Sequence, residues 1–407
     1  MNPVDKLRLV GQYMDSEVTD ASLTRPASLP GCGGNPRSAC DMHPHETLTD
    51  RKNAARSFPV HFAVMPNGKR IALLKTALTT ACERNCTYCA FRSGRDFDRQ
   101  TFTADEMAQA FMQLYRARIV EGLFISSGVA GGGLKTQDRL LDCAEILRKR
   151  YQYKGYVHLK IMPGAERDQV VQGMRLADRV SVNLESPTVQ RLSRLAPQKR
   201  FMEELLTPLK WVDQIRREMP SWKGWNGHWP SSTTQFVVGG IDETDLELLQ
   251  TTHFLHHELH LARVYFSGFS PVRDTPLENQ PAINPLREVR LYQADFLLRD
   301  YGFDFEELDF TQAGQLPLSA DPKVMWADRN LRHAPVELNR ADYSELIRVP
   351  GIGPINAKRI VQERKFHLLS CESDLHKIGV SVSRAVPYIL LNGKRPAQQL
   401  PLQLKIS

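Results

Sequence analysis

Six short runs of strand-forming residues recur along this chain, and helical patterns lie between them. The runs are IALLKTALT (71–79), GLFISS (122–127), YVHLKIM (156–162), RVSVNLE (179–185), TQFVVGG (234–240) and RVYFSG (263–268), and the helical patterns cover 104–119, 136–151, 201–219 and 243–259. Parallel strands need long crossovers, whereas antiparallel strands need only a hairpin turn. Strands separated by helices therefore predict parallel βαβ units and an α/β fold. An antiparallel sheet with one face in water is the alternative.

The predicted strands have one polar and one apolar face, because side chains two residues apart share a face. The polar faces are formed by His158 and Lys160, by Ser181, Asn183 and Glu185, and by Arg263, Tyr265 and Ser267. The opposite faces carry Leu159, Ile161, Val180, Val182, Leu184, Val264 and Phe266. In a βα barrel the outer face must be apolar to receive helices, while polar side chains near the carboxyl ends of the strands form the site. The pattern favours such a barrel.

The composition is that of a folded protein rather than of a membrane or disulfide-rich one. The 407 residues are 42% hydrophobic and 24% charged, without eighteen consecutive apolar residues or a signal-peptide pattern at the start. Seven cysteines are an odd and sparse set, which fits a reducing compartment. We therefore expect a cytoplasmic protein without a membrane partner. The net charge of +7 is a mild indication of polyanionic partners.

Three cysteines, Cys82, Cys86 and Cys89, follow the first predicted strand without a fourth nearby. A structural zinc site takes four ligands, and iron–sulfur clusters are also commonly held by four thiolates. Three thiolates therefore suggest a cluster in which one iron is left open for a substrate or cofactor. Cys32 and Cys40, with His43 and His45, have zinc-ligand types but match no common spacing.

The stretch from Cys82 to Cys89, with the aromatic Tyr88 just before the third cysteine, resembles the signature of the radical S-adenosylmethionine (radical SAM) enzymes. The resemblance implies a 4Fe-4S cluster on these thiolates and S-adenosylmethionine chelated to its open iron. It also implies reductive cleavage of S-adenosylmethionine to a 5'-deoxyadenosyl radical that abstracts hydrogen from a substrate. The fold it implies is a partial (β/α)6 barrel, in agreement with the six predicted strands.

Two further stretches are similar to cofactor-binding segments of these enzymes. SSGVAGGG (126–133) corresponds to a glycine-rich turn, so Ser126, Ser127 and Gly128 are expected near the methionine end of the cofactor, together with Tyr88. A phosphate-binding loop is the competing interpretation, but no Lys-Ser/Thr follows it. Asn183 and Glu185 are expected to bind the ribose hydroxyls or the methionine amino group. Alternatively, they line the lumen or form a salt bridge with Lys160.

The C-terminal part changes to short helices around the turn PGIGP (350–354). Helices are predicted over 340–349 and 355–365, with Asn339 as an N-cap and Pro354 in the first helical position. Gly351 and Gly353 permit a tight turn that leaves N–H groups for an anion, and Lys358 and Arg359 follow it. The stretch resembles a helix-hairpin-helix element that grips DNA phosphates without reading sequence. Residues 375–389 echo it as a second half. A helical cap or protein-docking module is the alternative.

Together with LKIMPGA (159–165), LAPQK (195–199) and PVELNRADYSELIRVPGIG (335–353), these features resemble a family of DNA modification/repair radical SAM proteins, over residues 58–392. The resemblance implies DNA, an electron donor such as flavodoxin or ferredoxin, and a uracil-DNA-glycosylase-like protein as partners. An RNA-modifying enzyme and a non-catalytic iron–sulfur scaffold are the alternatives. The segment from Trp222 to Trp229 is suited to stacking bases or to local packing.

The predicted organisation has five parts. They are a polar, largely disordered segment (1–57), the radical SAM barrel (58–310), a linker (311–334), the helix-hairpin-helix domain (335–392) and a tail (393–407).

Overall fold

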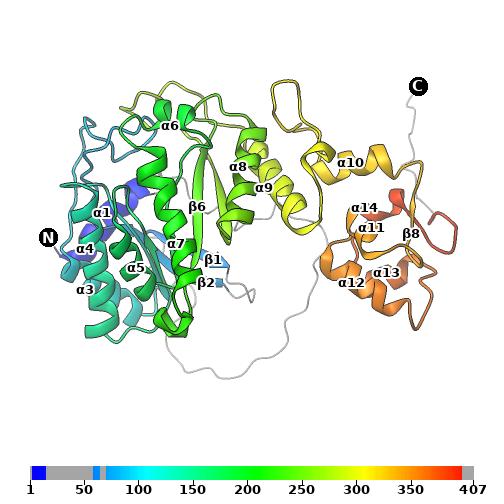
Figure 1. Cartoon of the computed structure of the whole chain (residues 1–407), viewed down its shortest axis with the longest axis horizontal. Coiled ribbons are helices and arrows are strands. Elements are labelled where there is room, and N and C mark those ends of the chain that lie inside the picture. Colours follow the sequence, from blue (N-terminus) through cyan, green and yellow to red (C-terminus); the bar gives the residue numbers. More distant parts are fainter. Residues whose placement is uncertain (1, 15–57, 65–69, 397–407) are drawn as a thin grey trace, which may run out of the picture. The chain divides into compact units, whose positions relative to one another are not determined.

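The computed structural model describes residues 2–14, 58–64 and 70–396 (Figure 1). Cys32, Cys40, His43 and His45 lie outside the described residues, as does the segment 15–57 that was predicted to be disordered. The chain divides into two compact units between Glu288 and Val289. This division falls inside helix α9 (Pro285–Asp300), earlier in the chain than the boundary predicted after residue 310.

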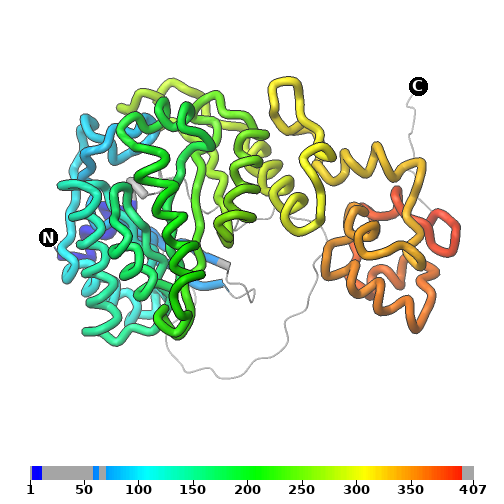
Figure 2. Tube along the Cα trace, viewed as in Figure 1, coloured from blue at the N-terminus to red at the C-terminus, as the bar shows by residue number. Residues whose placement is uncertain are grey.

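A single curled sheet of seven strands forms a half-barrel in the first unit. Its strand order follows the chain, and the colours of the trace change in the same order (Figure 2). β1 is antiparallel to β2, and the other neighbours are parallel. The strands are β1 (Val60–Val64), β2 (Arg70–Ala77), β3 (Gly122–Ser126), β4 (Val157–Lys160), β5 (Arg179–Ser181), β6 (Ser231–Val238) and β7 (Arg263–Gly268). The predicted α/β partial barrel is confirmed, and the edge strand β1 was not predicted.

Helices cover the outer face of the sheet (Figure 1). They are α1 (Pro3–Met14), α3 (Ala104–Arg116), α4 (Gly133–Glu145), α5 (Arg167–Leu176), α7 (Thr207–Glu218) and α8 (Asp245–Glu258). The short helix α6 (Val189–Leu195) lies at the edge of the unit, where Leu195 contacts the cysteine loop (Figure 1). Single π-helical turns lie next to two of them, at η2 (Ile146–Arg150) and η3 (Phe201–Leu206), where regular helix was predicted. Between α7 and β6 lie the short 3-10 helices η4 (Ser221–Lys223) and η5 (Trp225–Gly227).

Helix starts follow the capping rules. Thr103 accepts a hydrogen bond from the Glu106 N–H, and the Glu106 carboxylate accepts one from the Thr103 N–H, which fixes the start of α3. The outward side chains Leu159, Val180 and Phe266 are no more than 1% exposed, as the strand pattern predicted. No helix among the described residues is both long enough and apolar enough to span a membrane.

The second unit contains short helices around its own apolar core. They are α10 (Pro322–Asn330), α11 (Tyr343–Arg348), α12 (Pro354–Glu363), α13 (Glu372–Ile378) and α14 (Val382–Ala385), with the 3-10 helices η6 (Phe305–Glu307) and η7 (Val386–Tyr388) and the strand pair β8 (Val336–Glu337) and β9 (Ile389–Leu390). Ala327 and Leu331 belong to the same core as the hairpin helices. Part of the predicted linker 311–334 is therefore a structural element of this unit.

Asn339 is not the N-cap that the sequence predicted. Helix α11 begins later, where Asp342 accepts a hydrogen bond from the Glu345 N–H in a capping box. The Asn339 side chain instead donates to the carbonyl of Leu369 and accepts from its N–H, 2.9 Å in each case. A side chain engaged in this distant pairing cannot also cap its own helix. Pro354 occupies the first position of α12, as predicted.

Candidate active site

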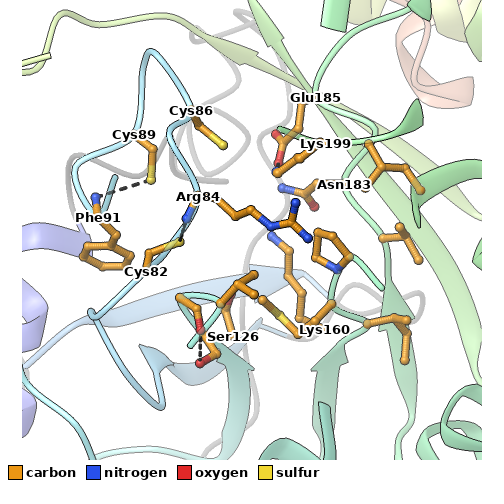
Figure 3. Close-up of a pocket in the computed structure, with 18 of the residues that line it drawn as sticks. Cys82, Arg84, Cys86, Cys89, Phe91, Ser126, Lys160, Asn183, Glu185 and Lys199 are labelled. Carbon is orange, nitrogen blue, oxygen red and sulfur yellow. Dashed lines mark hydrogen bonds and ion pairs between the residues drawn. The ribbon is translucent and has the colours of Figure 1, made fainter. Parts of the chain in front are cut away.

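The three predicted cysteines lie on the loop after β2 and line one cavity (Figure 3). Two of their sulfur atoms accept backbone hydrogen bonds at 3.4 Å, Cys82 Sγ from the Arg84 N–H and Cys89 Sγ from the Phe91 N–H. Cys86 is buried. N–H groups directed at sulfur stabilise the thiolate form, which is the form that binds metal. This loop therefore directs backbone N–H groups at two of the three sulfur atoms that line the cavity.

The segment LAPQK (195–199) holds this loop in place. The Leu195 carbonyl accepts hydrogen bonds from the Thr87 N–H and hydroxyl, at 2.9 and 2.8 Å. Arg84 donates to the Gln198 carbonyl and forms a 2.8 Å ion pair with Glu204, whose side chain is 6% exposed. The cysteine loop is thus fixed by contacts more than a hundred residues away along the chain.

The donor set of this cavity consists of three cysteine sulfur atoms, which fits the 4Fe-4S cluster of radical SAM proteins. Among the described residues, no three His, Cys, Asp or Glu side chains converge closely enough to hold one metal ion. In an iron–sulfur cluster each thiolate binds a different iron, so the ligands stand farther apart. The three cysteines that line the cavity in the described part of the chain match a 4Fe-4S cluster with one open iron.

Gly128 allows the loop after β3 to lie directly against the cysteine loop. A Cβ atom at this position would lie 2.2 Å from the Ala81 carbonyl oxygen and 3.1 Å from Cys82 Cβ. The Gly128 N–H also donates to the Thr79 carbonyl at 2.7 Å. Gly128 was predicted to make room for a cofactor. The structure shows that a glycine is needed here because the two loops approach each other too closely for a Cβ atom.

Glu185 lies beyond the end of β5 and forms an ion pair with Lys199 at one side of the cavity (Figure 3). Lys199 Nζ is 2.8 Å from Glu185 Oε1, and both side chains are nearly buried, at 11% and 6% exposure. The other oxygen, Oε2, is buried and has no hydrogen-bond partner among the described residues. Lys199 therefore pairs with Glu185, and Lys160, the partner predicted as an alternative, lines the same cavity.

The charges in this cavity are strongly coupled. Burial alone would raise the pKa of Glu185, but Lys199 and Lys160 lower it below its ordinary value. Burial raises the pKa of the Cys86 thiol, and Lys199 opposes this rise. Burial and the negative charge of Glu185 raise the pKa of Tyr88 well above its usual range. At neutral pH the cavity therefore holds a carboxylate, an ammonium group and a neutral phenol.

All the residues predicted to bind the cluster or the cofactor line this cavity: Cys82, Cys86, Tyr88, Cys89, Ser126, Ser127, Gly128, Asn183 and Glu185. Lys199 was not predicted as a site residue. Its only signal was its place in LAPQK (195–199), a segment noted for its resemblance to a family and not for its chemistry. Whether the lining residues contact the cofactor stays a prediction.

The tryptophan-rich segment is largely packed. Trp225 lies over the guanidinium group of Arg148, 3.9 Å from the ring centroid, and Trp229 Nε1 donates to the Met219 carbonyl at 3.0 Å. Trp222 is 71% exposed. The segment joins α7 to the start of β6, so it lies at the amino ends of the parallel strands, opposite the cysteine loop. This position favours the local-packing interpretation for two of the three rings.

The turn between α11 and α12 contains one glycine in the left-handed region. Gly351 has φ 84°, and a Cβ atom there would lie 2.5 Å from the Ser381 carbonyl oxygen. Gly353 has φ −104°, an extended conformation that any residue adopts, and is the N-cap of α12. The prediction that both glycines serve the tight turn is therefore correct only for Gly351.

The predicted second half of the hairpin packs on the first. Gly379 also lies in the left-handed region, with φ 90°, between α13 and α14. The Ser381 N–H donates to the Gly351 carbonyl at 3.2 Å. Arg359 Nη1 donates to the Ile378 carbonyl at 3.0 Å, so part of its guanidinium group joins the two halves. Lys358 is exposed on α12.

A buried lysine forms a hydrogen bond with the turn between α11 and α12. Lys323, on α10, is 7% exposed, and its Nζ donates to the Ile352 carbonyl at 2.7 Å. The ring centroid of Tyr301 is 4.5 Å from the same nitrogen. Burial lowers the pKa of Lys323 to about 7; Asp321 opposes this effect and Arg384 adds to it. No sequence pattern indicates this contact, because it joins residues 29 positions apart.

Two family models match this chain, one over the region of the cysteine cavity and one over the region of the α11–α12 turn. Residues 76–255 match the model of the Radical SAM superfamily, and residues 332–378 match the Helix-hairpin-helix motif. The chain thus carries a radical SAM domain followed by a helix-hairpin-helix motif, as the sequence resemblance implied. Radical SAM proteins use a 4Fe-4S cluster and S-adenosylmethionine, and the residues of the cavity fit both.

Individual relatives are distant. The uncharacterized protein MJ0785 of Methanocaldococcus jannaschii is 21% identical over 54% of this chain and 56% of its own length, so the chain matches little more than half of that relative. Methylornithine synthase (PylB) is 14% identical, with a TM-score of 0.45 over 62% of this chain and 69% of its own. HydG, a maturase of the [FeFe]-hydrogenase, is 13% identical, with a TM-score of 0.44 over 56% of this chain and 49% of its own.

Proposed function

We propose that this protein is a radical SAM enzyme that modifies or repairs DNA held by its helix-hairpin-helix region. The observation that carries the proposal is the presence, in one chain, of a three-thiolate cavity and a paired hairpin with an exposed cation on the helix after its turn. The cavity supplies the chemistry and the hairpin supplies a sequence-independent grip on phosphates.

Cys82, Cys86 and Cys89 would hold the cluster, which in this superfamily supplies the electron that cleaves S-adenosylmethionine. Glu185 Oε2 is placed to accept a hydrogen bond from an amino group, and Asn183 lines the same cavity. Lys199 keeps Glu185 ionised and in position. Tyr88, with its raised pKa, stays a neutral phenol in the same cavity. These residues bind and orient; none is assigned as a proton donor or acceptor in the reaction.

The hairpin is proposed to bind the DNA backbone through the N-terminus of α12 and Lys358. The first turn of a helix offers N–H groups without intrahelical partners and a partial positive charge, and both favour a phosphate. The left-handed Gly351 sets the turn that leads into this helix. We further propose a flavodoxin or ferredoxin as electron donor, and a uracil-DNA-glycosylase-like protein as a functional partner.

The test uses the full chain, reconstituted anaerobically with iron and sulfide. Wild-type protein should bind one 4Fe-4S cluster and form methionine and 5'-deoxyadenosine under reduction. Cys86→Ala should lose both properties. Cys371→Ala is the matched control, because Cys371 is exposed and lies in the other unit. A Cys86→Ala protein that still turned over S-adenosylmethionine would disprove the assignment of the site.

The substrate is tested with perdeuterated DNA and RNA oligonucleotides of equal sequence. Deuterium in 5'-deoxyadenosine from DNA alone supports the proposal. Transfer from RNA alone favours an RNA-modifying enzyme instead. Cluster binding without any cleavage of S-adenosylmethionine identifies a non-catalytic scaffold.

A further inference from the structure

A buried cation lies in the wall of the cysteine cavity. Lys199 lines the same cavity as the three cysteines, and its side chain is only 11% exposed. Burying an ammonium group is unfavourable unless nearby negative charges and hydrogen bonds offset the cost. The cavity therefore has to supply negative charge around Lys199 Nζ.

The backbone before Lys199 is tied to the cysteine loop at two points. The Leu195 carbonyl accepts hydrogen bonds from the Thr87 N–H and hydroxyl. The Gln198 carbonyl, one residue before Lys199, accepts a hydrogen bond from the guanidinium group of Arg84. These two contacts reach the loop on either side of its second cysteine. Lys199 cannot move away from the loop without breaking them.

The ammonium group of Lys199 has hydrogen-bonding capacity beyond its ion pair. Among the described residues, its Nζ has one hydrogen-bond acceptor, Glu185 Oε1, at 2.8 Å. An ammonium group carries three N–H donors. Figure 3 shows Cys86 pointing toward the side of the cavity where the Lys199–Glu185 pair lies. Two donors and the charge therefore remain for whatever occupies the cavity.

The negative charges around Lys199 include two of the sulfur atoms. Burial alone would lower the pKa of this lysine, but the negative charges of Cys86, Glu185 and Cys89 raise it above its ordinary value. At Cys86 the attraction of Lys199 is stronger than the repulsion of Glu185. The pair therefore presents a net positive charge to this sulfur atom.

A fixed charge at this position affects the reduction of a cluster. An electron added to a cluster on the three cysteines adds negative charge to a site that already carries three thiolates. Net charge and solvent exposure are among the factors that set the reduction potential of an iron–sulfur cluster. A cation beside the sulfur ligands favours the reduced form, whereas a carboxylate favours the oxidised form. Buried charges act strongly because solvent and salt screen them little.

We propose that Lys199 sets the reduction potential: its buried charge makes the cluster on the three cysteines easier to reduce, and Glu185 limits this effect. The inference rests on the cluster site proposed above and adds the residue that sets how readily the cluster accepts an electron. Because the electron that cleaves S-adenosylmethionine comes from the cluster, Lys199 determines which fraction of the protein is ready for cleavage at a given potential of the donor.

The test is an anaerobic redox titration of the full, reconstituted protein without S-adenosylmethionine, followed by the electron paramagnetic resonance signal of the reduced cluster. In Lys199→Met, the ratio of reduced to oxidised cluster at the wild-type midpoint should fall tenfold or more, a shift of about 59 mV for one electron. In Glu185→Gln the same ratio should rise. Lys199→Arg keeps the charge and should stay close to wild type. Lys149→Met, which removes a 74% exposed lysine of the same unit, is the control.

A double variant guards against misfolding. Lys199→Met combined with Glu185→Gln removes both charges, so it leaves no buried charge without its partner. It differs from Glu185→Gln only at Lys199, and its potential should be the lower of the two. This comparison decides the question if Lys199→Met alone does not retain its cluster.

Opposite shifts in the two single variants, at wild-type iron content, support the inference. An unchanged potential in Lys199→Met, or shifts of the same sign in both variants, would overturn it, because lost packing does not depend on the sign of the charge removed. Cleavage of S-adenosylmethionine is measured in parallel. Opposite shifts without any cleavage refute the proposed activity and leave the role of Lys199 standing, whereas cleavage with unchanged potentials refutes that role alone.

Discussion

Lys199 Nζ donates to Glu185 Oε1 at 2.8 Å, while Glu185 Oε2 lacks a hydrogen-bond partner among the described residues. One carboxylate thus has one oxygen fixed by the protein and one available to a ligand. Burying a charged pair is unfavourable unless further hydrogen bonds satisfy it. The pair is therefore expected to gain stability when a donor reaches Oε2.

Glu185→Gln should weaken binding of S-adenosylmethionine tenfold or more. The amide keeps the size of the side chain but loses the negative charge, and it leaves the Lys199 ammonium group without its counter-charge. Anaerobic equilibrium binding on reconstituted protein measures the effect, and iron content should stay at the wild-type level. Glu203→Gln, an exposed change on η3, is the control. Wild-type affinity in Glu185→Gln would reduce Glu185 to a lumen-lining residue.

Gly351→Ala and Gly353→Ala should differ, although both glycines belong to one turn. Gly351 is left-handed, and its Cβ would clash with the Ser381 carbonyl, so we expect a loss of about 1–3 kcal/mol in stability. At Gly353 the nearest atom to a Cβ is the Tyr301 hydroxyl, at 3.2 Å, and the backbone is extended. Hydrogen exchange across residues 343–388 and DNA affinity test both. Equal losses in the two variants would contradict this ranking.

Lys358→Gln should weaken DNA binding at low salt and make it less sensitive to salt. Removing one cation that neutralises a phosphate reduces the log–log salt slope on duplex DNA by about 0.9. A salt titration of affinity for an arbitrary duplex measures the slope, and a scrambled sequence should give the same result. Lys149→Gln, which removes a 74% exposed lysine of the other unit, should leave the slope unchanged. An unaltered slope in Lys358→Gln would show that Lys358 does not bind phosphate.

Raising the pH from about 7 to about 10 should stabilise the second unit. The pKa of Lys323 is lowered to about 7 by burial, whereas an unfolded lysine has a pKa of about 10.4. Between these values the unfolded chain binds more protons than the folded chain, so the free energy of unfolding rises with pH. Lys323→Met should abolish this rise. Hydrogen exchange of α10 and α12, compared between the two proteins at each pH, provides the measurement. Parallel pH profiles would refute the prediction.

The strands of the barrel and the cysteine loop could be predicted because their signals are local. Apolar and β-branched runs mark β2 to β7, and the spacing from Cys82 to Cys89 specifies a three-thiolate site. Proline at position 354 marks the start of α12 in the same way, because its missing N–H has no partner there in any case. Elements of this kind depend on neighbours along the chain.

The contacts that complete the sites could not be predicted, because they depend on tertiary structure. Lys199 reaches Glu185 only after α6 has turned the chain back. Asn339 is a residue type that often caps helices, but its side chain forms hydrogen bonds with the Leu369 backbone instead of with a helix N-terminus. The sequence around Lys323 predicts an ordinary helical lysine, and only the tertiary fold brings its Nζ to the Ile352 carbonyl. Sequence patterns assign residue types to elements, whereas these roles arise from packing between elements.

Glu185 adopts a left-handed backbone conformation, φ 64°, at the isolated bridge to Phe236. A non-glycine residue in this region costs about 1–2 kcal/mol. Glycine would relieve that cost and remove the carboxylate at the same time. A directed search for heat-resistant variants would therefore select glycine at position 185 and would enrich protein that lacks the carboxylate proposed to bind the cofactor. A screen for heat resistance at this position therefore needs a parallel assay for cleavage of S-adenosylmethionine.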